Sequence, residues 1–252
     1  MKKQIAVLLC CSLATPVPTA LASNPVSMNP RIEVGYQDYE LETKAQIFGT
    51  KAKDKYQINP AIIRLGLTAA WNRVYLDGYY QTTNNDSDTV DFAEFNYSEI
   101  IDGDRSEYTA SLGYTVFDPF AIFLGYRHAK AKGSGTLGAD YDFKSDAFFV
   151  GSTYSWQVSD TGVLSFNIAY ADVYDADQNL DSSLVTVDLS GDGNGLKTGV
   201  SWRGALSDKL SFSLAADWYK YDYDLDSTTN TSQSADVEET EITYRIGLVY
   251  AF

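Results

Sequence analysis

The last nine residues of the chain, 244–252, alternate between large apolar side chains and small or charged ones. Successive side chains of a β-strand point to opposite faces, so this pattern predicts a two-faced strand that reaches the final residue. In a soluble domain the apolar face would pack on a core, whereas in a membrane-spanning barrel it would face lipid and Arg245 would face the lumen. The apolar parity consists of Tyr244, Ile246, Leu248, Tyr250 and Phe252.

The first 22 residues have the features of a secretory signal peptide. Lys2 and Lys3 precede an apolar run, which ends at the small residues Ala20 and Ala22. The run is too short to cross a bilayer as a helix, because a spanning helix takes about 20 apolar residues. We therefore expect export through the Sec pathway and one mature domain, 23–252, which contains no cysteine for disulfide or thiol chemistry.

Composition limits the classes of function. The formal net charge of -15 argues against nucleic acid as a partner, because phosphates are bound by clustered Lys and Arg. The 19 Tyr and 4 Trp against 6 Pro indicate an aromatic-rich β protein. No segment after the signal approaches about 20 consecutive apolar residues, so we expect no transmembrane helix. Nothing in the sequence indicates a cofactor.

Ten segments show the alternation expected of strands with one apolar and one polar face. Short turns recur near residues 72, 118, 160 and 208. Longer polar segments lie between them, at 42–58, 83–105, 133–145, 174–194 and 225–239. The predicted strands are 31–41, 61–71, 74–82, 106–117, 121–130, 146–158, 163–172, 195–205, 210–222 and 240–252.

An even number of strands places both termini on one side of a membrane, and short turns on that side with long loops opposite are typical of outer-membrane barrels. Aromatic residues also gather at both ends of the apolar faces, as two girdles. A secreted β-sandwich or propeller needs neither girdle. The sequence therefore predicts an all-β fold, an antiparallel up-and-down transmembrane β-barrel of ten strands with both termini periplasmic. One merged hairpin would reduce the number to eight.

The final eight residues resemble the C-terminal β-signal of Gram-negative outer-membrane proteins. That signal has a polar residue, a glycine two positions later, and two aromatic or apolar residues of which the second is a terminal Phe. Arg245, Gly247, Tyr250 and Phe252 fill the pattern. The chain is thus similar to the small barrels of the OmpA-like porin superfamily. The resemblance implies a location in the bacterial outer membrane and recognition by the barrel-assembly machinery.

The polar parity of the predicted strands carries many charged residues. We expect these side chains to line the lumen, where pairing offsets the cost of removing charges from water. Tyr75, Tyr79 and Tyr219 share this parity and are expected to hydrogen-bond with them. The ten predicted lumen-lining charges are Arg31, Glu33, Arg64, Asp77, Glu107, Arg127, Lys197, Arg203, Asp217 and Arg245.

Two interpretations of these charges remain open from sequence. Eight strands leave an interior that side chains fill and sixteen leave a channel, so ten lies near the filled end. In the first interpretation the charges only pack the lumen. In the second they line a narrow conduit for ions or small solutes, with a weak anion preference set by Arg64, Arg127, Arg203 and Arg245.

The mature chain contains one histidine, His128, and enzymes of this barrel size must be considered. The omptin proteases are ten-stranded barrels with an Asp-His pair two residues apart, but Tyr126 stands two residues before His128. The outer-membrane phospholipase pattern has a Ser two residues after its His, and Lys130 occupies that position. We therefore predict no catalytic residue and no enzymatic activity, with His128 at the outer rim of the barrel.

Two of the polar segments are rich in carboxylates. The run Asp175, Asp177, Asn179 and Asp181 is a weak candidate for a metal site, because the calcium-loop template wants Gly and Glu where Leu180 and Thr186 stand. Solvated loops are the simpler interpretation. The alternative is that these acids share divalent cations with the phosphates of lipopolysaccharide. The segment 42–58 instead carries Lys44, Lys51, Lys53 and Lys55, which could contact those phosphates directly.

The sequence thus favours a structural or narrow porin-like role, with passive passage of ions or small solutes. The alternative is a cell-surface binding protein or adhesin that acts through acidic extracellular loops. The expected partners are outer-membrane lipid, lipopolysaccharide and the barrel-assembly machinery. The pattern does not indicate a solute, a receptor or an oligomeric state.

Overall fold

A computed structural model describes residues 26–47, 50–92, 97–136, 138–160, 162–181, 186–227 and 233–252. The predicted signal peptide, 1–22, lies outside these residues. Among the described residues, no helix is long and apolar enough to span a membrane.

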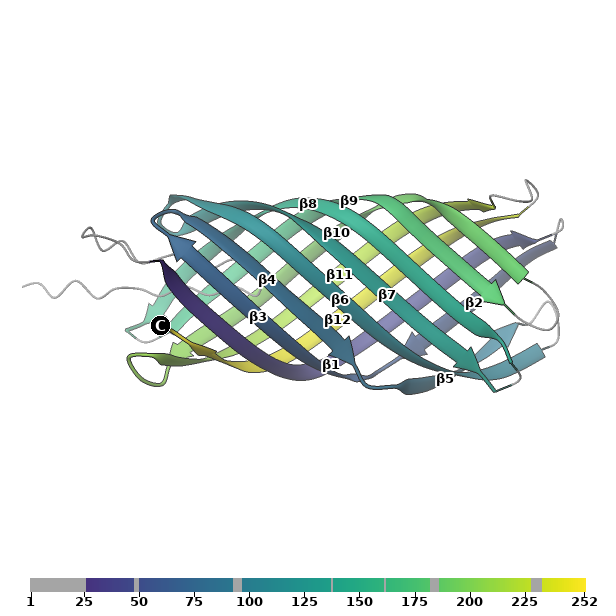
Figure 1. The fold of residues 1–252 in the computed structure, drawn as a ribbon, viewed down its shortest axis with the longest axis horizontal. Coiled ribbons are helices and arrows are strands. Elements are labelled where there is room, and N and C mark those ends of the chain that lie inside the picture. The colour runs from purple at the N-terminus through teal and green to yellow at the C-terminus, as the bar shows by residue number, and fades with distance from the viewer. Residues whose placement is uncertain are drawn as a thin grey trace, which may run out of the picture.

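All regular structure in the described ranges is β-strand, and the strands close into a barrel (Figure 1). Every pair of neighbouring strands is antiparallel, and the ring closes where β1 pairs with β12 from Arg31↔Val249 to Gln46↔Ser234. The predicted antiparallel up-and-down barrel is therefore confirmed. The strands are β1 Ser27–Ile47, β2 Thr50–Ile58, β3 Ala61–Trp71, β4 Val74–Thr83, β5 Asp86–Phe92, β6 Tyr97–Phe117, β7 Phe120–Gly135, β8 Asp140–Ser159, β9 Gly162–Asp181, β10 Thr186–Ala205, β11 Leu210–Ser227 and β12 Ser234–Tyr250.

The barrel wall has ten positions, although twelve strands are described, because two positions hold an interrupted strand. β3 and then β2 pair with successive halves of β1, and β4 and then β5 pair with successive halves of β6. The interruptions fall at Asn59-Pro60 and at Asn84-Asn85. Proline has no backbone N–H to donate to a ladder, so a break at Pro60 is expected.

The two interrupted positions are joined differently at their two ends. β3 and β4 form a regular ladder from Ile62↔Thr83 to Trp71↔Val74. β2 and β5, among the described strands, share no backbone ladder. Instead the N–H groups of Gln57 and Asn59 donate to the carboxylates of Asp88 and Asp86, at 2.8 and 2.7 Å. We call this junction the carboxylate seam.

The first described residues of β1 and the C-terminus lie at the end of the barrel that carries the short turns (Figure 1). The N–H of Phe252 donates to the carbonyl of Met28 at 3.1 Å, and the N–H of Ala251 donates to the carbonyl of Lys209 at 2.8 Å. Asn72 forms the first short turn with a positive φ of 54°, which asparagine tolerates better than most residues. This arrangement agrees with two periplasmic termini.

The prediction of five long loops was wrong, because strands continue through most of these segments. β1 and β6 are each 21 residues long, and β8, β9 and β10 are each 20. A tilted membrane strand needs about 9–11 residues. The barrel is therefore about twice as long as the membrane is thick, and we call the half farther from the short turns the extension.

The polarity of the wall inverts between the two halves. On β11, Leu214 faces outward and is exposed, whereas Tyr221, Tyr223 and Leu225 farther along the same strand face inward and are buried. The outward positions beside them hold Asp222, Asp224 and Asp226. The membrane half is thus apolar outside and polar inside, and the extension is the reverse. We call the outward apolar residues of the membrane half the lipid belt.

One irregularity in β9 keeps its acidic residues outside. Val173 and Ala176 are both buried, although three steps separate them, and Tyr174 and Asp175 between them are both exposed. The ladder to β8 skips one residue of β9 here, and the ladder to β10 skips two residues of β9 against one of β10, so β9 carries one extra residue on both sides. This β-bulge shifts the parity of the strand by one residue. Without the shift, Asp177 and Asp181 would point into the barrel.

Candidate functional site: the charged lumen

The structure places all ten predicted lumen charges inside the barrel, where each is buried. They come from β1, β3, β4, β6, β7, β10, β11 and β12, because each strand of the membrane half turns its polar parity inward. The residues form two groups along the barrel. We call them the lower cluster, around Asp77 and Asp217, and the upper cluster, around Glu107 and Glu239.

In the lower cluster, Arg31 and Asp77 form a bidentate ion pair with distances of 2.6 Å between Nη1 and Oδ1 and 2.9 Å between Nη2 and Oδ2. The hydroxyl of Thr68 donates to the same Asp77 Oδ1 at 2.5 Å. Parallel guanidinium–carboxylate hydrogen bonds are among the strongest polar contacts in proteins. This pair fixes β1 against β4 across the intervening β3.

The rest of the lower cluster connects β12, β11 and β10. Arg245 donates to Asp217, and its Nε lies 3.6 Å from Oε2 of Glu33. The Nζ of Lys197 donates to the hydroxyl of Tyr219 at 2.6 Å and lies 3.6 Å from Asp217 Oδ1. Each carboxylate here faces more than one cation, which offsets the cost of burying it.

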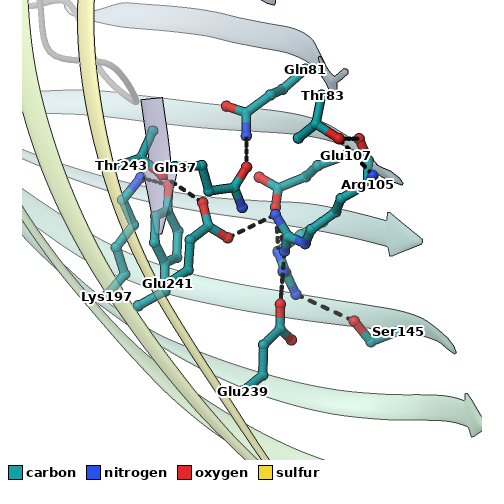
Figure 2. Close-up of polar contacts among 12 residues, drawn as sticks. Gln37, Gln81, Thr83, Arg105, Glu107, Ser145, Lys197, Glu239, Glu241 and Thr243 are labelled. Atoms are coloured by element: carbon teal, nitrogen blue, oxygen red, sulfur yellow. Dashed lines mark hydrogen bonds and ion pairs between the residues drawn. The ribbon is translucent and has the colours of Figure 1, made fainter. Parts of the chain in front are cut away.

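The upper cluster is built around Glu239 of β12 (Figure 2). Its carboxylate accepts from Arg105 Nη2 at 2.8 Å, from Arg127 Nη2 at 3.3 Å and from the hydroxyl of Tyr223. Glu107 accepts from Arg127 Nε at 3.0 Å, and Arg105 Nη1 lies 2.7 Å from Glu241 Oε2. The network therefore joins strands β6, β7, β11 and β12 across the lumen.

Aromatic rings complete the polar packing. The guanidinium of Arg64 lies 3.9 Å from the ring centroid of Tyr79, and that of Arg127 lies 4.4 Å from the centroid of Tyr221. The Tyr79 hydroxyl donates to Glu107 at 2.5 Å. Desolvated cation–π contacts contribute about 2 kcal/mol each. The tyrosines thus fill space that isolated charges would leave to water.

Four buried charges of the lumen were not predicted. Arg105 and Glu99 lie in the polar segment 83–105 and Glu239 in the segment 225–239, where the sequence pattern predicts loops, but the structure places them in β6 and β12. Glu241 lies within the predicted strand 240–252, on the parity of Arg245. The sequence signal for these residues is the alternation of each strand: counting inward positions beyond the last apolar residue of the outer face reaches all four.

With these four residues the buried charge is balanced. Among the described residues, seven cations and seven carboxylates are buried. A pore that selects ions by charge carries rings of one sign at its constriction. A balanced set instead neutralises itself. The buried charges are Arg31, Arg64, Arg105, Arg127, Lys197, Arg203, Arg245, Glu33, Asp77, Glu99, Glu107, Asp217, Glu239 and Glu241.

Above the upper cluster the lumen of the extension is filled by apolar side chains, which we call the apolar plug. Tyr39, Ile58, Phe143, Tyr223 and Leu225 are each at most 2% exposed and belong to one continuous cluster. Beneath the plug, a cavity of about 20 Å³ lies beside Lys197 and Tyr219. That volume suits a single water molecule. The described lumen is thus occupied by side chains at both levels.

Comparisons with known proteins agree with this architecture. No family model and no curated protein sequence matches the chain. The outer membrane protease OmpT from Escherichia coli matches with a TM-score of 0.67 at 11% identity, over 91% of this chain and 99% of that one. This chain has the fold of an outer-membrane β-barrel protein. OprG from Pseudomonas aeruginosa matches with a TM-score of 0.46 at 12% identity, over 89% of this chain and 95% of that one.

The barrel places His128 on its outer wall, outside the charged lumen. Its Nδ1 lies 2.9 Å from Asp146 Oδ1, and its ring stacks on Tyr108 at 4.9 Å between centroids. Tyr126 also donates to Asp146. No Ser, Thr or Cys side chain is joined to His128 by a hydrogen bond among the described residues. The group forms part of the aromatic girdle where the belt meets the extension.

The candidate metal run does not form a loop in this barrel. Asp175, Asp177, Asn179 and Asp181 lie on the outer face of β9, at alternate positions of an extended strand. Partial burial and the neighbouring Asp175 raise the pKa of Asp177. Among the described residues, no three His, Cys, Asp or Glu side chains converge in a way that could hold a metal ion. Extended geometry separates the carboxylates, which corrects the loop-based prediction.

The lysines of β1 and β2 lie on the outer face of the extension. Lys44 and Lys53 contact Glu42 at 3.0 and 3.1 Å, and these hydrogen bonds lower the pKa of the Glu42 carboxyl. Lys55 contacts Glu40 at 2.8 Å. These amines are therefore engaged by carboxylates of the same hairpin.

The residues of the β-signal have separate positions in the barrel. Arg245 belongs to the lower cluster, whereas Tyr250 and Phe252 lie outside with ring centroids 4.9 Å apart. Gly247 faces inward, and a Cβ there would lie 2.6 Å from the Cγ of Glu33 and from the carbonyl oxygen of Ile32. The glycine of the pattern is thus required by close packing in this fold.

Proposed function

We propose that this outer-membrane barrel is closed and non-conducting and has a structural role in the envelope. The observation that carries the proposal is the filled lumen, in which a balanced network of buried charges lies below an apolar plug. A narrow conduit would need a continuous hydrated path. The filled lumen supports packing over the anion-selective conduit that the arginines alone suggest.

Planar-bilayer recording of the refolded protein tests this proposal. We expect no stepwise conductance in concentrated KCl at moderate voltage, with a general porin in the same bilayer as the control for the assay. The variant Arg127→Ala should leave the traces closed, because Glu239 and the apolar plug remain. Stable steps whose size or ion preference changes with Arg127→Ala would establish the conduit.

We further propose that the protein has no catalytic activity. His128 is paired with Asp146 on the lipid-facing side of the wall, and Asp146 already accepts from Tyr126. General-base catalysis needs a reactive partner within hydrogen-bond reach of the imidazole. Assays of the reconstituted protein with peptide and phospholipid substrates should show no turnover. Turnover that His128→Ala abolishes would contradict this part of the proposal.

Export and assembly complete the proposal. The Sec signal at 1–22 is supported by Lys2 and Lys3 before the apolar run that ends at Ala20 and Ala22. Kinship with the OmpA-like porin superfamily and delivery by the barrel-assembly machinery are supported by the β-signal pattern of Arg245, Gly247, Tyr250 and Phe252. Deleting Phe252 should reduce the amount of folded protein in the outer-membrane fraction of cells. Refolding of the same variant from urea into detergent should be nearly unchanged, because Phe252 is 77% exposed and packs little.

A second candidate function is surface binding through the extension. Its outer face on β10, β11 and β12 places like charges directly opposite one another, as in Asp192↔Asp224 and Asp222↔Glu238. Such pairs destabilise a sheet, so a bound cationic ligand would offset the repulsion between the opposed carboxylates. Binding of cells to host or phage ligands, compared between the native protein and Asp224→Asn, tests this candidate. Equal binding by the two would exclude it.

A further inference from the structure

Arg64 of β3 is a fully buried cation that forms no ion pair with any described carboxylate. Its Nε and Nη2 donate to Oε1 of Gln81 at 2.9 and 2.5 Å, and its guanidinium lies over the ring of Tyr79. The third nitrogen, Nη1, is buried and has no hydrogen-bond partner in the described part of the chain. Charges inside proteins are normally paired with an opposite charge, because removing them from water is costly. Arg64 therefore lacks the counter-charge that such a position requires.

A second guanidinium with a spare donor lies beside it. Arg245 of β12 donates from Nη2 to Asp217, but its Nη1 is also buried without a partner among the described residues. β3 and β12 flank β1, where Arg64 stands opposite Glu33 and Arg245 stands opposite Gly35, all on the inward face. The two guanidiniums repel one another at this range. An anion placed between them would remove the repulsion and accept from both Nη1 atoms.

The neighbours of Arg245 are small. On β1 the residue directly opposite is Gly35, and on β11 it is Ala215. Neither side chain extends beyond Cβ, so no cross-strand side chain covers either flank of the arginine. A small ligand beside Arg245 therefore competes with no neighbouring side chain for this position.

The charge of the lumen is balanced as a whole but divided unevenly along the barrel. Among the described residues, the lower level holds five buried cations against three carboxylates, and the upper level holds two cations against four. A water molecule would satisfy the spare donors of the lower level without changing its charge, whereas an anion does both. The lower level consists of Arg31, Arg64, Lys197, Arg203, Arg245, Glu33, Asp77 and Asp217, and the upper level of Arg105, Arg127, Glu99, Glu107, Glu239 and Glu241.

We propose that Arg64 and Arg245 bind one small monovalent inorganic anion, of the class of chloride, between their Nη1 atoms. A divalent anion such as sulfate would be repelled by Glu33 and Asp217, which both act on these guanidiniums. The bound ion is a structural counter-charge of the lower cluster. The inference goes beyond the closed lumen proposed above, since the two cations require a partner whether or not a conducting path exists.

Anomalous diffraction from crystals equilibrated with sodium bromide locates the ion, because bromide replaces chloride and scatters anomalously. We expect a peak inside the barrel within hydrogen-bond distance of Nη1 of both Arg64 and Arg245. Crystals equilibrated with sodium gluconate are the control and should show no anomalous peak there. Bromide peaks confined to exposed lysines such as those of β1 and β2 would mean an adventitious ion only, and would contradict the proposal.

Urea unfolding of the detergent-refolded protein measures the same ion in solution. Sodium gluconate is replaced stepwise by sodium chloride at constant ionic strength. A ligand that binds only the folded state stabilises it by mass action, so the ratio of folded to unfolded protein should rise about tenfold for each tenfold rise in chloride above the dissociation constant. Arg64→Gln, and independently Arg245→Gln, should remove this dependence. Arg73→Gln, which removes an exposed arginine at a short turn, should retain it.

Either of two results on the native protein would overturn the proposal, so it stays testable even where a lumen variant fails to fold. One is the absence of the internal bromide peak, which would assign the spare donors to water. The other is an unfolding midpoint that is the same in chloride and in gluconate. Persistence of the chloride dependence in both folded arginine variants would also contradict it, because the ion would then bind elsewhere.

Discussion

Glu238 and Glu239 are consecutive residues of β12 in opposite environments. Glu239 faces the lumen, where it accepts from Arg105, Arg127 and Tyr223, and Glu238 faces water, where it pairs with Lys220. At the scale of single residues, the lumen depends on mutual neutralisation. Removing one member therefore leaves an uncompensated buried charge, which costs far more than the same change outside.

Glu239→Ala should accordingly destabilise the barrel by about 3–5 kcal/mol, because two buried guanidiniums lose a shared carboxylate. The matched control, Glu238→Ala, should cost no more than about 1 kcal/mol, since its ion pair with Lys220 is exposed. Urea-induced unfolding from phospholipid vesicles, followed by tryptophan fluorescence, measures both. Equal effects of the two substitutions would mean that the lumen is hydrated enough to screen its charges.

The residue scale is also where the sequence was most informative. The parity of each strand sufficed to place all ten charges, because a period of two leaves one choice of face per strand. Parity could not assign partners, since Arg31 meets Asp77 across 46 positions and Arg105 meets Glu239 across 134. Such pairing depends on how the ring closes and on its stagger, which no local pattern records.

At the scale of elements, the sequence pattern did not predict where the strands end, because the large apolar residues move from the outward to the inward positions partway along each strand. Past Trp218 the large apolar residues of β11 switch to Tyr221, Tyr223 and Leu225, and the outward positions become aspartates. A run of alternating aspartates is typical of a solvated loop as well as of a strand with a wet outer face. Only the pairing of β11 with β10 and β12 distinguishes the two.

The β9 bulge gives a prediction at this scale. Deleting Tyr174 removes the extra residue while Asp175 and Asp177 stay outside and Ala176 stays inside, so the barrel should still fold. β11 has no register shift with β10 or β12. Deleting Asp222 would therefore turn every residue on one side of the deletion to the opposite face of the sheet, and should prevent folding. Heat-modifiable mobility on gels distinguishes the outcomes. Failure of the Tyr174 deletion to fold would show that the bulge itself is required.

The carboxylate seam gives a second prediction about elements. Replacing Asp86 and Asp88 together with Ala removes the acceptors of the Gln57 and Asn59 amides, while the ladders of β2 with β1 and of β5 with β6 remain. Hydrogen exchange in a peptide covering 50–60 should accelerate, because β2 would then be hydrogen-bonded along one edge only, and such a strand opens at low cost. The exposed neighbour Ser87→Ala is the control and should leave the exchange unchanged. Unchanged exchange in the double variant would mean that the seam is held by the apolar plug alone.

At the scale of the whole molecule, the barrel consists of two coaxial halves of opposite polarity in one continuous wall. The membrane half is an outer-membrane barrel with a charged interior, and the extension resembles a water-soluble barrel with an apolar core. The two halves meet inside the barrel, where the apolar plug packs above the ion pairs. The boundary runs through the girdle of Tyr36, Tyr108, Tyr126 and Tyr244, where one end of a ring meets lipid and the other meets water.

This two-half architecture predicts that substitution with Arg will have a large effect on stability at one outward position of β12 and almost none at another. Leu248→Arg places a charge in the lipid belt and should destabilise the protein in vesicles by about 2–4 kcal/mol, the cost measured for Arg on the lipid face near mid-bilayer. Asp236→Arg on the extension should change stability by no more than about 0.5 kcal/mol, as surface substitutions usually do. It also removes the like-charge contact with Asp224. Unfolding in vesicles of increasing bilayer thickness locates the boundary, because a thicker bilayer raises the cost at Leu248 first. A comparable penalty at Asp236 would place the extension inside the membrane and remove the two-half description.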